Sequence, residues 1–443
     1  MKDKLAGSCG VPTQAFGRTF LVAWAAFFVI AAQTTMKAVR DAVFLAHFGL
    51  QALAYSMLGM AFLAWLMVSA YHRITGSIGR RRAVFWLQML AAGSMVLLGE
   101  GLARGVPGMP IVLYVYGGTI GLIAIAEIWL LADDLVAVTT HEATRSLTLV
   151  GTGAIVGGIF GGVLTRVFAK SWSPRTMLCG VAIEMAAAAV LMGIAARRQH
   201  HVNEAVPRPR FDDGLRVLRD NRYVRTLGVV MLCLTVAITT MEWQLKGLAR
   251  AHFSLLHGNE TTEQSLVAFF GLFGAGVSVV SLLLQLGGTQ PLLRRFGAFT
   301  CMRILPSSLG AVSLALVFLV VSPMGALALA CAGAGWSDTL RLSLDKAATE
   351  LLYVPLAHDT RAAAKRVVDT VVDRLGGAIT AGAWLVMVAV WHVDEPGRVG
   401  YASVLTLVTV VVWLFALTRM GKEHARLEAA ARVVVVPPRV LSV

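Results

Sequence analysis

Charged side chains are scarce in this chain of 443 residues, since Asp, Glu, Lys and Arg together make up only 14% of it. Soluble globular domains carry about 25% charged residues, so this composition excludes an ordinary soluble protein. In their place, 57% of the residues are hydrophobic, grouped in apolar runs along the whole sequence. Runs of about 20 apolar residues predict membrane-spanning helices. No separate soluble domain of useful size is expected between them.

Motifs for metal, redox and nucleotide-hydrolysing chemistry are also missing. The five cysteines are scattered, and none stands at the paired spacing of a metal or redox site. The sequence has no GxxxxGK[ST] loop, so hydrolysis of ATP at a P-loop is not supported. The polar start of the chain lacks the apolar region of a signal peptide. We therefore expect no catalytic residues, no metal and no cofactor, and hence no enzyme.

The apolar runs predict an all-α membrane protein with about twelve spans. The longest basic stretch separates the sixth span from the seventh, and its second part has the pattern of an amphipathic helix on the membrane surface. The predicted parts are an N-terminal six-helix bundle (1–196), a cytoplasmic linker (197–224), a C-terminal six-helix bundle (225–420) and a tail (421–443). The spans are expected near 19–36, 50–71, 83–103, 109–132, 147–168, 175–196, 225–243, 265–287, 299–321, 324–340, 371–392 and 400–418.

The net charge of +14 does not indicate a nucleic-acid partner, because the basic residues lie in the connections between spans. If both ends of the chain are cytoplasmic, most of the 39 Lys and Arg residues fall on the cytoplasmic side. We therefore expect a multi-pass protein of the inner membrane with both termini inside. Two six-helix halves and the loop RITGSIGRRR (73–82) after the second span resemble the major facilitator architecture.

A glycine-rich stretch, GTGAIVGGIFGGVL, lies inside the fifth span at residues 151–164. A dinucleotide-binding loop is a poor interpretation, because no soluble strand precedes it. Small residues spaced along a membrane helix let neighbouring backbones approach closely. Close helix packing is therefore the function that we expect for these glycines.

Charges inside the spans are candidates for function, because an ionised group at bilayer depth costs about 2.5 kcal/mol or more. Glu127 stands deep in the fourth span with no cation within one helical turn, so its partner must come from another helix or from a substrate. Glu242 and Lys246 share one face at the end of the seventh span, four residues apart. The role of Glu184, in the sixth span, stays open.

Two cations and an acid, Lys37, Arg40 and Asp41, follow the first apolar run. If their helix face lines a cavity, it presents positive charge to an anion, and the planar fork of arginine suits phosphate or carboxylate. A cluster in an outer loop exposed to water explains the same residues equally well. The acids and bases at the entry to the eleventh span also allow two interpretations, a functional network or mutual neutralisation near the headgroups.

Four islands of sequence resemble the ATP/ADP translocases of plastids and obligate intracellular bacteria. The most specific is RLSLDKAATELLYVPLAHDTRAAAKRVVDTVVDRLGG, residues 341–377. The others are MKAVRDAVFL, AEIWLL and MEWQLKGLA, in the same order along the chain. The resemblance implies a carrier of nucleotides or related phosphorylated anions, with antiport of the ATP/ADP type by alternating access. It also implies that a base stacks on an aromatic ring such as Trp129 or Trp243, although tryptophan at this depth more often packs.

The resemblance, together with the charges, assigns residues to two roles. Those expected to bind substrate are Arg40, Lys246, Arg341, Lys37, Glu127 and Glu242. Those expected to form gating or charge pairs are Asp41, Lys365, Asp369 and Arg374. The expected partners are a phosphorylated anion and the lipid bilayer, and the oligomeric state stays open.

Two alternatives remain open. In a proton-coupled carrier of a drug or a non-phosphate metabolite, Glu127 would titrate and the cations would only neutralise acids. A membrane sensor would bind a ligand without moving it, but such a protein usually needs an output module. Uptake of labelled nucleotides into vesicles separates these possibilities.

Overall fold

The structure is a computed structural model that describes residues 13–136, 140–197, 211–255, 261–318, 322–353, 355–356, 358–368, 372–395 and 397–435. Every regular element in these ranges is a helix, so the all-α prediction is confirmed. Within the described residues, each of the twelve predicted spans overlaps a helical segment, and the first helix extends beyond its predicted span at both ends. Long apolar runs are sufficient to specify these helices, since a membrane leaves the backbone no other hydrogen-bond partners.

The chain divides into two compact units. Unit 1 contains residues 1–204 together with 249–282, and unit 2 contains residues 205–248 together with 283–443. The grouping of 249–282 with unit 1 is an arrangement that the sequence did not suggest. The predicted division into bundles, linker and tail stays a prediction.

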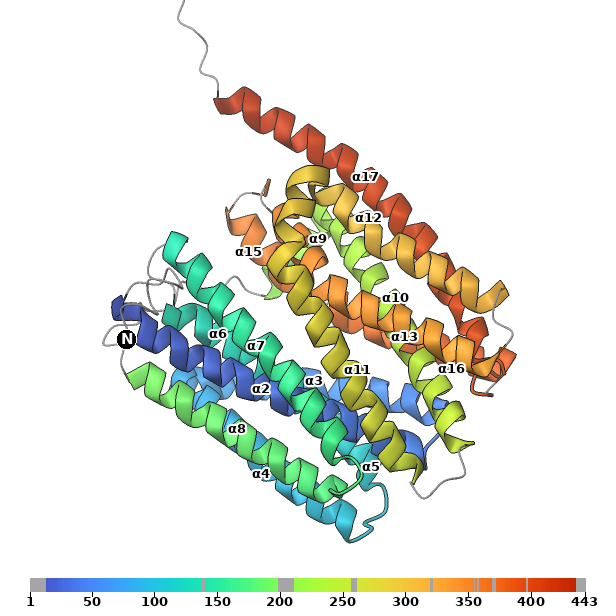
Figure 1. The fold of residues 1–443 in the computed structure, drawn as a ribbon. Coiled ribbons are helices and arrows are strands. Elements are labelled where there is room, and N and C mark those ends of the chain that lie inside the picture. The colour runs from blue at the N-terminus through green and yellow to red at the C-terminus, as the bar shows by residue number, and fades with distance from the viewer. Residues whose placement is uncertain are drawn as a thin grey trace, which may run out of the picture. The chain divides into compact units, whose positions relative to one another are not determined.

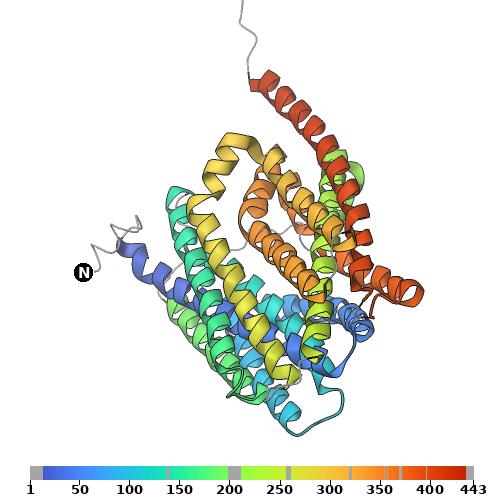
Figure 2. The same ribbon diagram turned by 45° about the vertical axis from the view of Figure 1, so that its right-hand side comes forward.

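Unit 1 is built around its first long helix, α2, which packs against α7 and α8, while α4 packs against the other side of α8 (Figures 1 and 2). A short π-helical segment, η1, interrupts the fourth predicted span. The elements are α2 (Thr13–His47), α3 (Leu50–Ile78), α4 (Arg80–Ala103), α5 (Met109–Val112), η1 (Leu113–Gly117), α6 (Gly118–Val136), α7 (Thr140–Phe168), α8 (Pro174–Arg197) and most of α11 (Thr262–Gly287).

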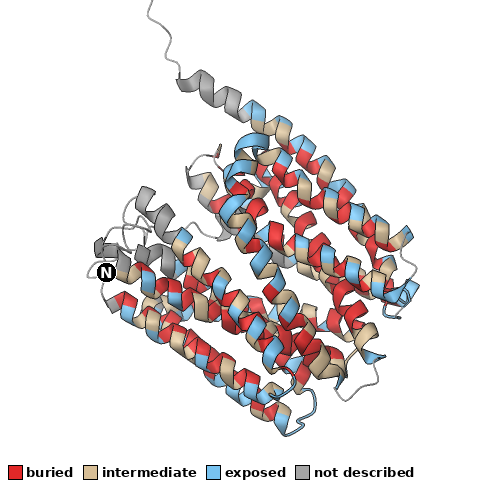
Figure 3. Cartoon of the chain, viewed as in Figure 1, coloured by how far each residue is buried: buried red, intermediate tan, exposed pale blue. Residues whose placement is uncertain are grey.

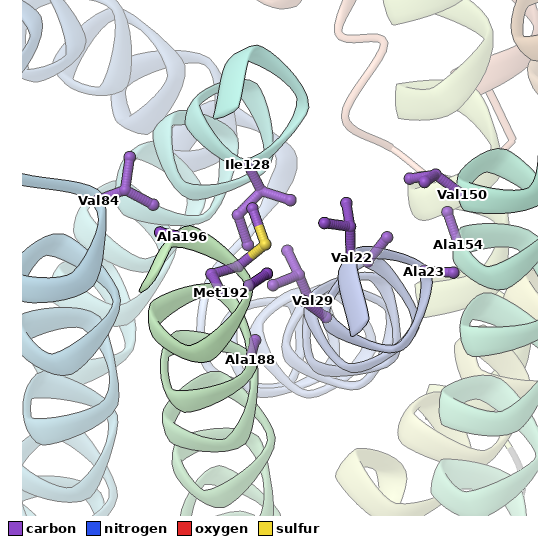
Figure 4. Packing of buried hydrophobic residues seen from close by; sticks show 13 residues of the cluster. Val22, Ala23, Val29, Val84, Ile128, Val150, Ala154, Ala188, Met192 and Ala196 are labelled. Atoms are coloured by element: carbon purple, nitrogen blue, oxygen red, sulfur yellow. The ribbon is translucent and has the colours of Figure 1, made fainter. Parts of the chain in front are cut away.

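Aliphatic side chains from five helices meet in the core of unit 1 (Figure 4). Val22 and Val29 of α2 lie at its centre, with Ile128 of α6 and Met192 of α8 around them. Small side chains, such as Ala154 of α7, let the neighbouring helices approach α2 closely. The packing of α2 therefore fixes where its charged residues stand within the unit.

The glycines of α7 allow contact on two sides. A Cβ atom on Gly153 would lie 2.6 Å from the carbonyl oxygen of Ala23 in α2. A Cβ atom on Gly162 would lie 2.6 Å from the backbone of α11 at Gly271 and Ala275. These distances are too short for a side chain, so the prediction of close helix packing at this stretch is confirmed.

In unit 2, α12 runs along α17 (Figure 1). The predicted amphipathic helix of the linker exists as α9 and packs against α15, whereas its position at a membrane surface stays a prediction. The elements are α9 (Phe211–Asp220), most of α10 (Arg222–Ser254), α12 (Thr289–Phe318), α13 (Pro323–Leu340), the π-helical η2 (Arg341–Asp345), α14 (Lys346–Leu352), α15 (His358–Val367), α16 (Asp373–Trp391), the 3₁₀ turn η4 (Val399–Ala402) and α17 (Ser403–Val435).

Two helix junctions depend on glycine. Gly79 separates α3 from α4 with φ of 80°, and Gly297 divides α12 into two helical parts with φ of 74°. Positive φ values of this kind are accessible to glycine and disfavoured for other residues.

Behind the first junction, Arg81 donates from Nη1 to the carbonyl of Ala196 at the end of α8, at 3.1 Å. The basic loop thus satisfies a carbonyl at a helix C-terminus.

Ten helices in the described ranges are long and apolar enough to cross a membrane. The two remaining predicted spans correspond to α13 and α16, which are shorter. Large apolar side chains are exposed along the spans, as Leu97, Ile183, Phe318 and Val411 illustrate, and exposed positions recur along the helices in Figure 3. Apolar surface of this extent suits contact with lipid rather than water. The protein is a multi-pass membrane protein.

Candidate functional site

Arg40 and Asp41 lie inside a membrane helix, not in a loop. Helix α2 continues past them to His47, and the two side chains are only 8% and 1% exposed. The interpretation of this cluster as a water-exposed outer loop is therefore wrong. The apolar residues that follow, from Ala42 to Leu45, extend the helix, and pairing of the two charges lowers the cost of burying them. Lys37, one turn earlier, is partly exposed.

The guanidinium of Arg40 has a defined orientation. Its Nε and Nη2 atoms each lie 2.9 Å from Oδ1 of Asp41. The Cζ atom lies 4.6 Å from the centre of the Tyr114 ring, in the geometry of a cation–π contact. A Cβ atom on Gly118 would lie 2.5 Å from Nη1, so the glycine leaves room for the guanidinium.

The π-helical segment η1 supplies Tyr114 and ends immediately before Gly118. A π-helical turn adds one residue to the turn and changes which side chains face the neighbouring helix. Such segments are frequent at functional sites. Tyr114 of this segment and Gly118, directly after it, both lie close to the Arg40 guanidinium.

Glu127 has the partner on another helix that the sequence required. The hydroxyl of Tyr71, in α3, donates to Oε2 of Glu127, in α6, at 3.0 Å. Both side chains are buried. This hydrogen bond links two helices of unit 1 at bilayer depth.

The pair of Glu242 and Lys246 is confirmed in unit 2. Nζ of Lys246 lies 3.1 Å from Oε1 of Glu242, one turn earlier in α10. The lysine is 3% exposed and the glutamate 30%. Between them, Trp243 is buried against Trp384 with ring centres 5.0 Å apart, which assigns it to packing rather than to base stacking. Trp129 packs against the core of unit 1.

The signature segment folds into η2, α14 and α15 in unit 2. Arg341 is the first residue of η2 and its side chain is exposed. Nζ of Lys365 lies 2.7 and 2.8 Å from the two carboxylate oxygens of Glu350, a residue from α14. The sequence indicated Asp369 as the neighbour of Lys365. Asp369 lies outside the described residues, and of Arg374 the structure describes only its place in the first turn of α16.

The predicted residues thus divide between the two units. Unit 1 holds Lys37, Arg40, Asp41 and Glu127, and unit 2 holds Glu242, Lys246, Arg341 and Lys365. Sequence reasoning missed Tyr71, Tyr114 and Glu350 as partners of these charges. Glu350 was visible as a member of the signature segment, whereas nothing in the sequence singled out the two tyrosines. In the described part of the chain, no three His, Cys, Asp or Glu side chains form a group that could hold a metal ion.

Solved transporters share this fold. The crystal structure of the nucleoside transporter NupG matches with a TM-score of 0.63 at 12% identity, covering 91% of this chain and 99% of that one. A bacterial homologue of the iron transporter ferroportin, in its inward-facing state, matches with a TM-score of 0.62 at 14% identity, covering 91% and 98%. At such identities the likeness shows the fold alone, which is that of major facilitator-type transporters.

The family is defined by sequence. Residues 186–424 match the model of the TLC ATP/ADP transporter family, and the chain belongs to that family. ADP,ATP carrier protein 1 of Chlamydia muridarum is 25% identical over 242 residues, which are 51% of this chain and 44% of that protein. ADP,ATP carrier protein 1 of Arabidopsis thaliana chloroplasts is 25% identical over 313 residues, 63% of this chain and 48% of that protein. The matches thus span about half the length of these relatives.

Proposed function

We propose that this chain is a carrier of nucleotides or related phosphorylated anions and that it exchanges them across the inner membrane in the manner of an ATP/ADP antiporter. The observation that carries the proposal is the burial of two cations, Arg40 and Lys246, inside membrane helices. Buried charge at this depth is costly, so it is kept where a ligand of opposite charge uses it. Membership of the TLC family supports a nucleotide as that ligand.

Each buried cation has an acid within one helical turn. Asp41 neutralises Arg40, and Glu242 neutralises Lys246. When a phosphate group binds, its oxygens take the place of the carboxylate at the cation or share the cation with it. The carboxylate then competes with the substrate, so binding remains weak enough for release. A guanidinium suits this exchange because it offers two parallel hydrogen bonds to phosphate.

The remaining residues fit supporting roles in the same proposal. Arg341, exposed at the start of η2, is a further phosphate contact, and Lys37 assists Arg40. Glu127, held by Tyr71, positions the elements around the cations or carries a coupling proton. The Glu350–Lys365 bridge is a gating pair whose rupture accompanies a change of state. In the proposed orientation both termini are cytoplasmic.

Reconstitution of the purified protein into liposomes tests this proposal. We expect uptake of labelled ATP when the liposomes contain ADP, and little uptake when they contain no nucleotide, because an antiporter needs an internal substrate to exchange. Competition by a panel of nucleotides, sugar phosphates and inorganic phosphate then defines the substrate. Uptake no greater than in protein-free liposomes, combined with transport of an uncharged or non-phosphate compound, would overturn the proposal. Binding of ATP without uptake would indicate a sensor instead.

A further inference from the structure

Unit 1 contains a second buried carboxyl, Glu184 of α8, which none of the roles above uses. The residue is only 8% exposed, and its Oε2 atom has no hydrogen-bond partner among the described residues. A carboxylate in such surroundings loses its bound water and gains no hydrogen bond in its place. The neutral acid is therefore the form that suits this packing of the helices.

A small cavity adjoins this carboxyl. It lies between α2, α7 and α8, and besides Glu184 it is lined by Thr35, Thr165, Trp172 and several apolar side chains. Its volume of about 10 Å³ gives room for roughly one water molecule. A water there would have polar partners in the carboxyl and the two hydroxyls.

The two hydroxyl groups connect the cavity to the helix that carries Arg40. Oγ1 of Thr165, in α7, lies 3.1 Å from Oγ1 of Thr35, in α2. The Thr165 hydroxyl also donates to the carbonyl of Gly161 at 2.7 Å. Thr35 stands five positions before Arg40 in the same helix, so a movement of α2 changes both places together.

Charged groups that would stabilise an ionised Glu184 do not line the cavity. Its lining within the described part of the chain contains no other charged side chain. Charged residues of the surrounding segments include Lys37, Arg40 and Asp41 of α2, Glu100 of α4, Arg166 of α7, Lys170 after α7, Arg175 of α8 and Glu263 of α11, and none of them belongs to the lining. Glu100 and Arg175 instead pair with each other at 2.9 Å.

We propose that Glu184 is a proton-binding site and that the carrier moves a proton together with its substrate. When α2, α7 and α8 separate and water enters, the carboxylate is solvated and the proton leaves to water. When they close, one carboxylate oxygen takes a proton from a hydronium ion, forming an O–H bond and releasing water, with no redox change. Because α2 also carries Arg40, substrate binding at Arg40 and protonation of Glu184 both depend on the same movement of α2. This coupling to transport rests on the proposed function, whereas the proton site itself does not.

Infrared spectroscopy of the purified protein tests the proton site without any substrate. We expect a carboxylic-acid C=O band in the wild type at neutral pH, sensitive to exchange into heavy water and absent from Glu184→Gln. Glu100→Gln is the matched control, because that carboxyl is partly exposed and already paired with two arginines. Identical bands in the wild type and Glu184→Gln would overturn the proposal.

Proteoliposomes that enclose a pH-sensitive dye test the coupling. We expect addition of ATP to change the internal pH with the wild type, and the change to fall to the level of protein-free liposomes with Glu184→Gln while ATP/ADP exchange persists. Glu184→Asp keeps an ionisable group and should restore the proton signal, which separates loss of the site from poor folding. An unchanged proton signal in Glu184→Gln, or exchange without any proton signal in the wild type, would overturn the coupling. If the wild type moves no nucleotide at all, the proposed function fails, and the infrared band still decides the proton site.

Discussion

The ammonium of Lys246 lies 3.1 Å from the carboxylate of Glu242, yet the lysine is almost fully buried while the glutamate keeps 30% of its surface exposed. The two ends of one ion pair therefore meet different surroundings. Part of the carboxylate side chain lies at the protein surface, whereas the ammonium is enclosed. This asymmetry makes the glutamate the more easily displaced partner when an anion reaches the lysine.

Exchanging the two charges separates stability from transport. We expect Lys246→Gln to lower the free energy of unfolding by about 1 kcal/mol, because the carboxylate that it leaves is partly exposed, and Glu242→Gln to lower it by about 3 kcal/mol, because that change removes the acid from a buried ammonium. The double variant Glu242→Lys with Lys246→Glu should regain part of that stability and still fail to take up ATP, since the cation no longer stands at position 246. Thermal unfolding and vesicle uptake measure the two effects. Full recovery of uptake in the swapped variant would contradict a phosphate-binding role for Lys246.

Gly118 controls the space around the Arg40 guanidinium. We expect Gly118→Ala to displace Nη1 of Arg40, from which the new Cβ would lie 2.5 Å, and to raise the KM for substrate about tenfold, equivalent to about 1.4 kcal/mol. Stability should change little, because the crowded atoms are the ends of two flexible side chains, Arg40 and Met60. Gly93→Ala is the control, since its Cβ would meet nothing within 4 Å. Equal KM values for the two variants would argue against Arg40 as a substrate contact.

The glycines of α7 are expected to matter for folding. Gly153→Ala places a methyl group 2.6 Å from the carbonyl oxygen of Ala23, and backbone cannot yield as a side chain can. We expect a loss of about 1–3 kcal/mol in stability, the usual cost of overpacking. Gly276→Ala in α11 has no atom within 4 Å of its Cβ and should be neutral. Thermal unfolding in detergent compares the two, and a neutral Gly153→Ala would show that α2 and α7 are less closely packed.

The bridge between Glu350 and Lys365 should affect rate more than stability. Both side chains are 43% exposed, so we expect Lys365→Ala to change stability by less than about 1 kcal/mol. If the bridge opens and closes during transport, the variant should alter kcat while KM stays nearly constant. Glu395→Ala, which removes another exposed ion pair at 3.3 Å from Arg398, is the control. Identical kcat values in the wild type and Lys365→Ala would remove the bridge from the transport cycle.

Local features of this protein were predictable from the sequence. Apolar runs of sufficient length form helices in a membrane whatever their neighbours, so each predicted span overlaps a helical segment in the described residues. The Glu242–Lys246 pair was predictable for a similar reason, because residues four apart meet within one helix. The glycine stretch of α7 indicated close packing without revealing which helices would approach it.

Partners from distant segments were decided only by the tertiary structure. Tyr71 and Glu127 are 56 positions apart, and Thr35 and Thr165 are 130 apart, so no spacing rule connects them. The first span was also predicted to end before Arg40, because three charged residues close together normally mark the edge of an apolar run. In the folded unit, Asp41 and Tyr114 stabilise that cation inside the helix. The apolar runs therefore determined the helices, and the spacing of charges along one helix determined their local pairs. Packing between helices decided which charges are buried and what each one contacts.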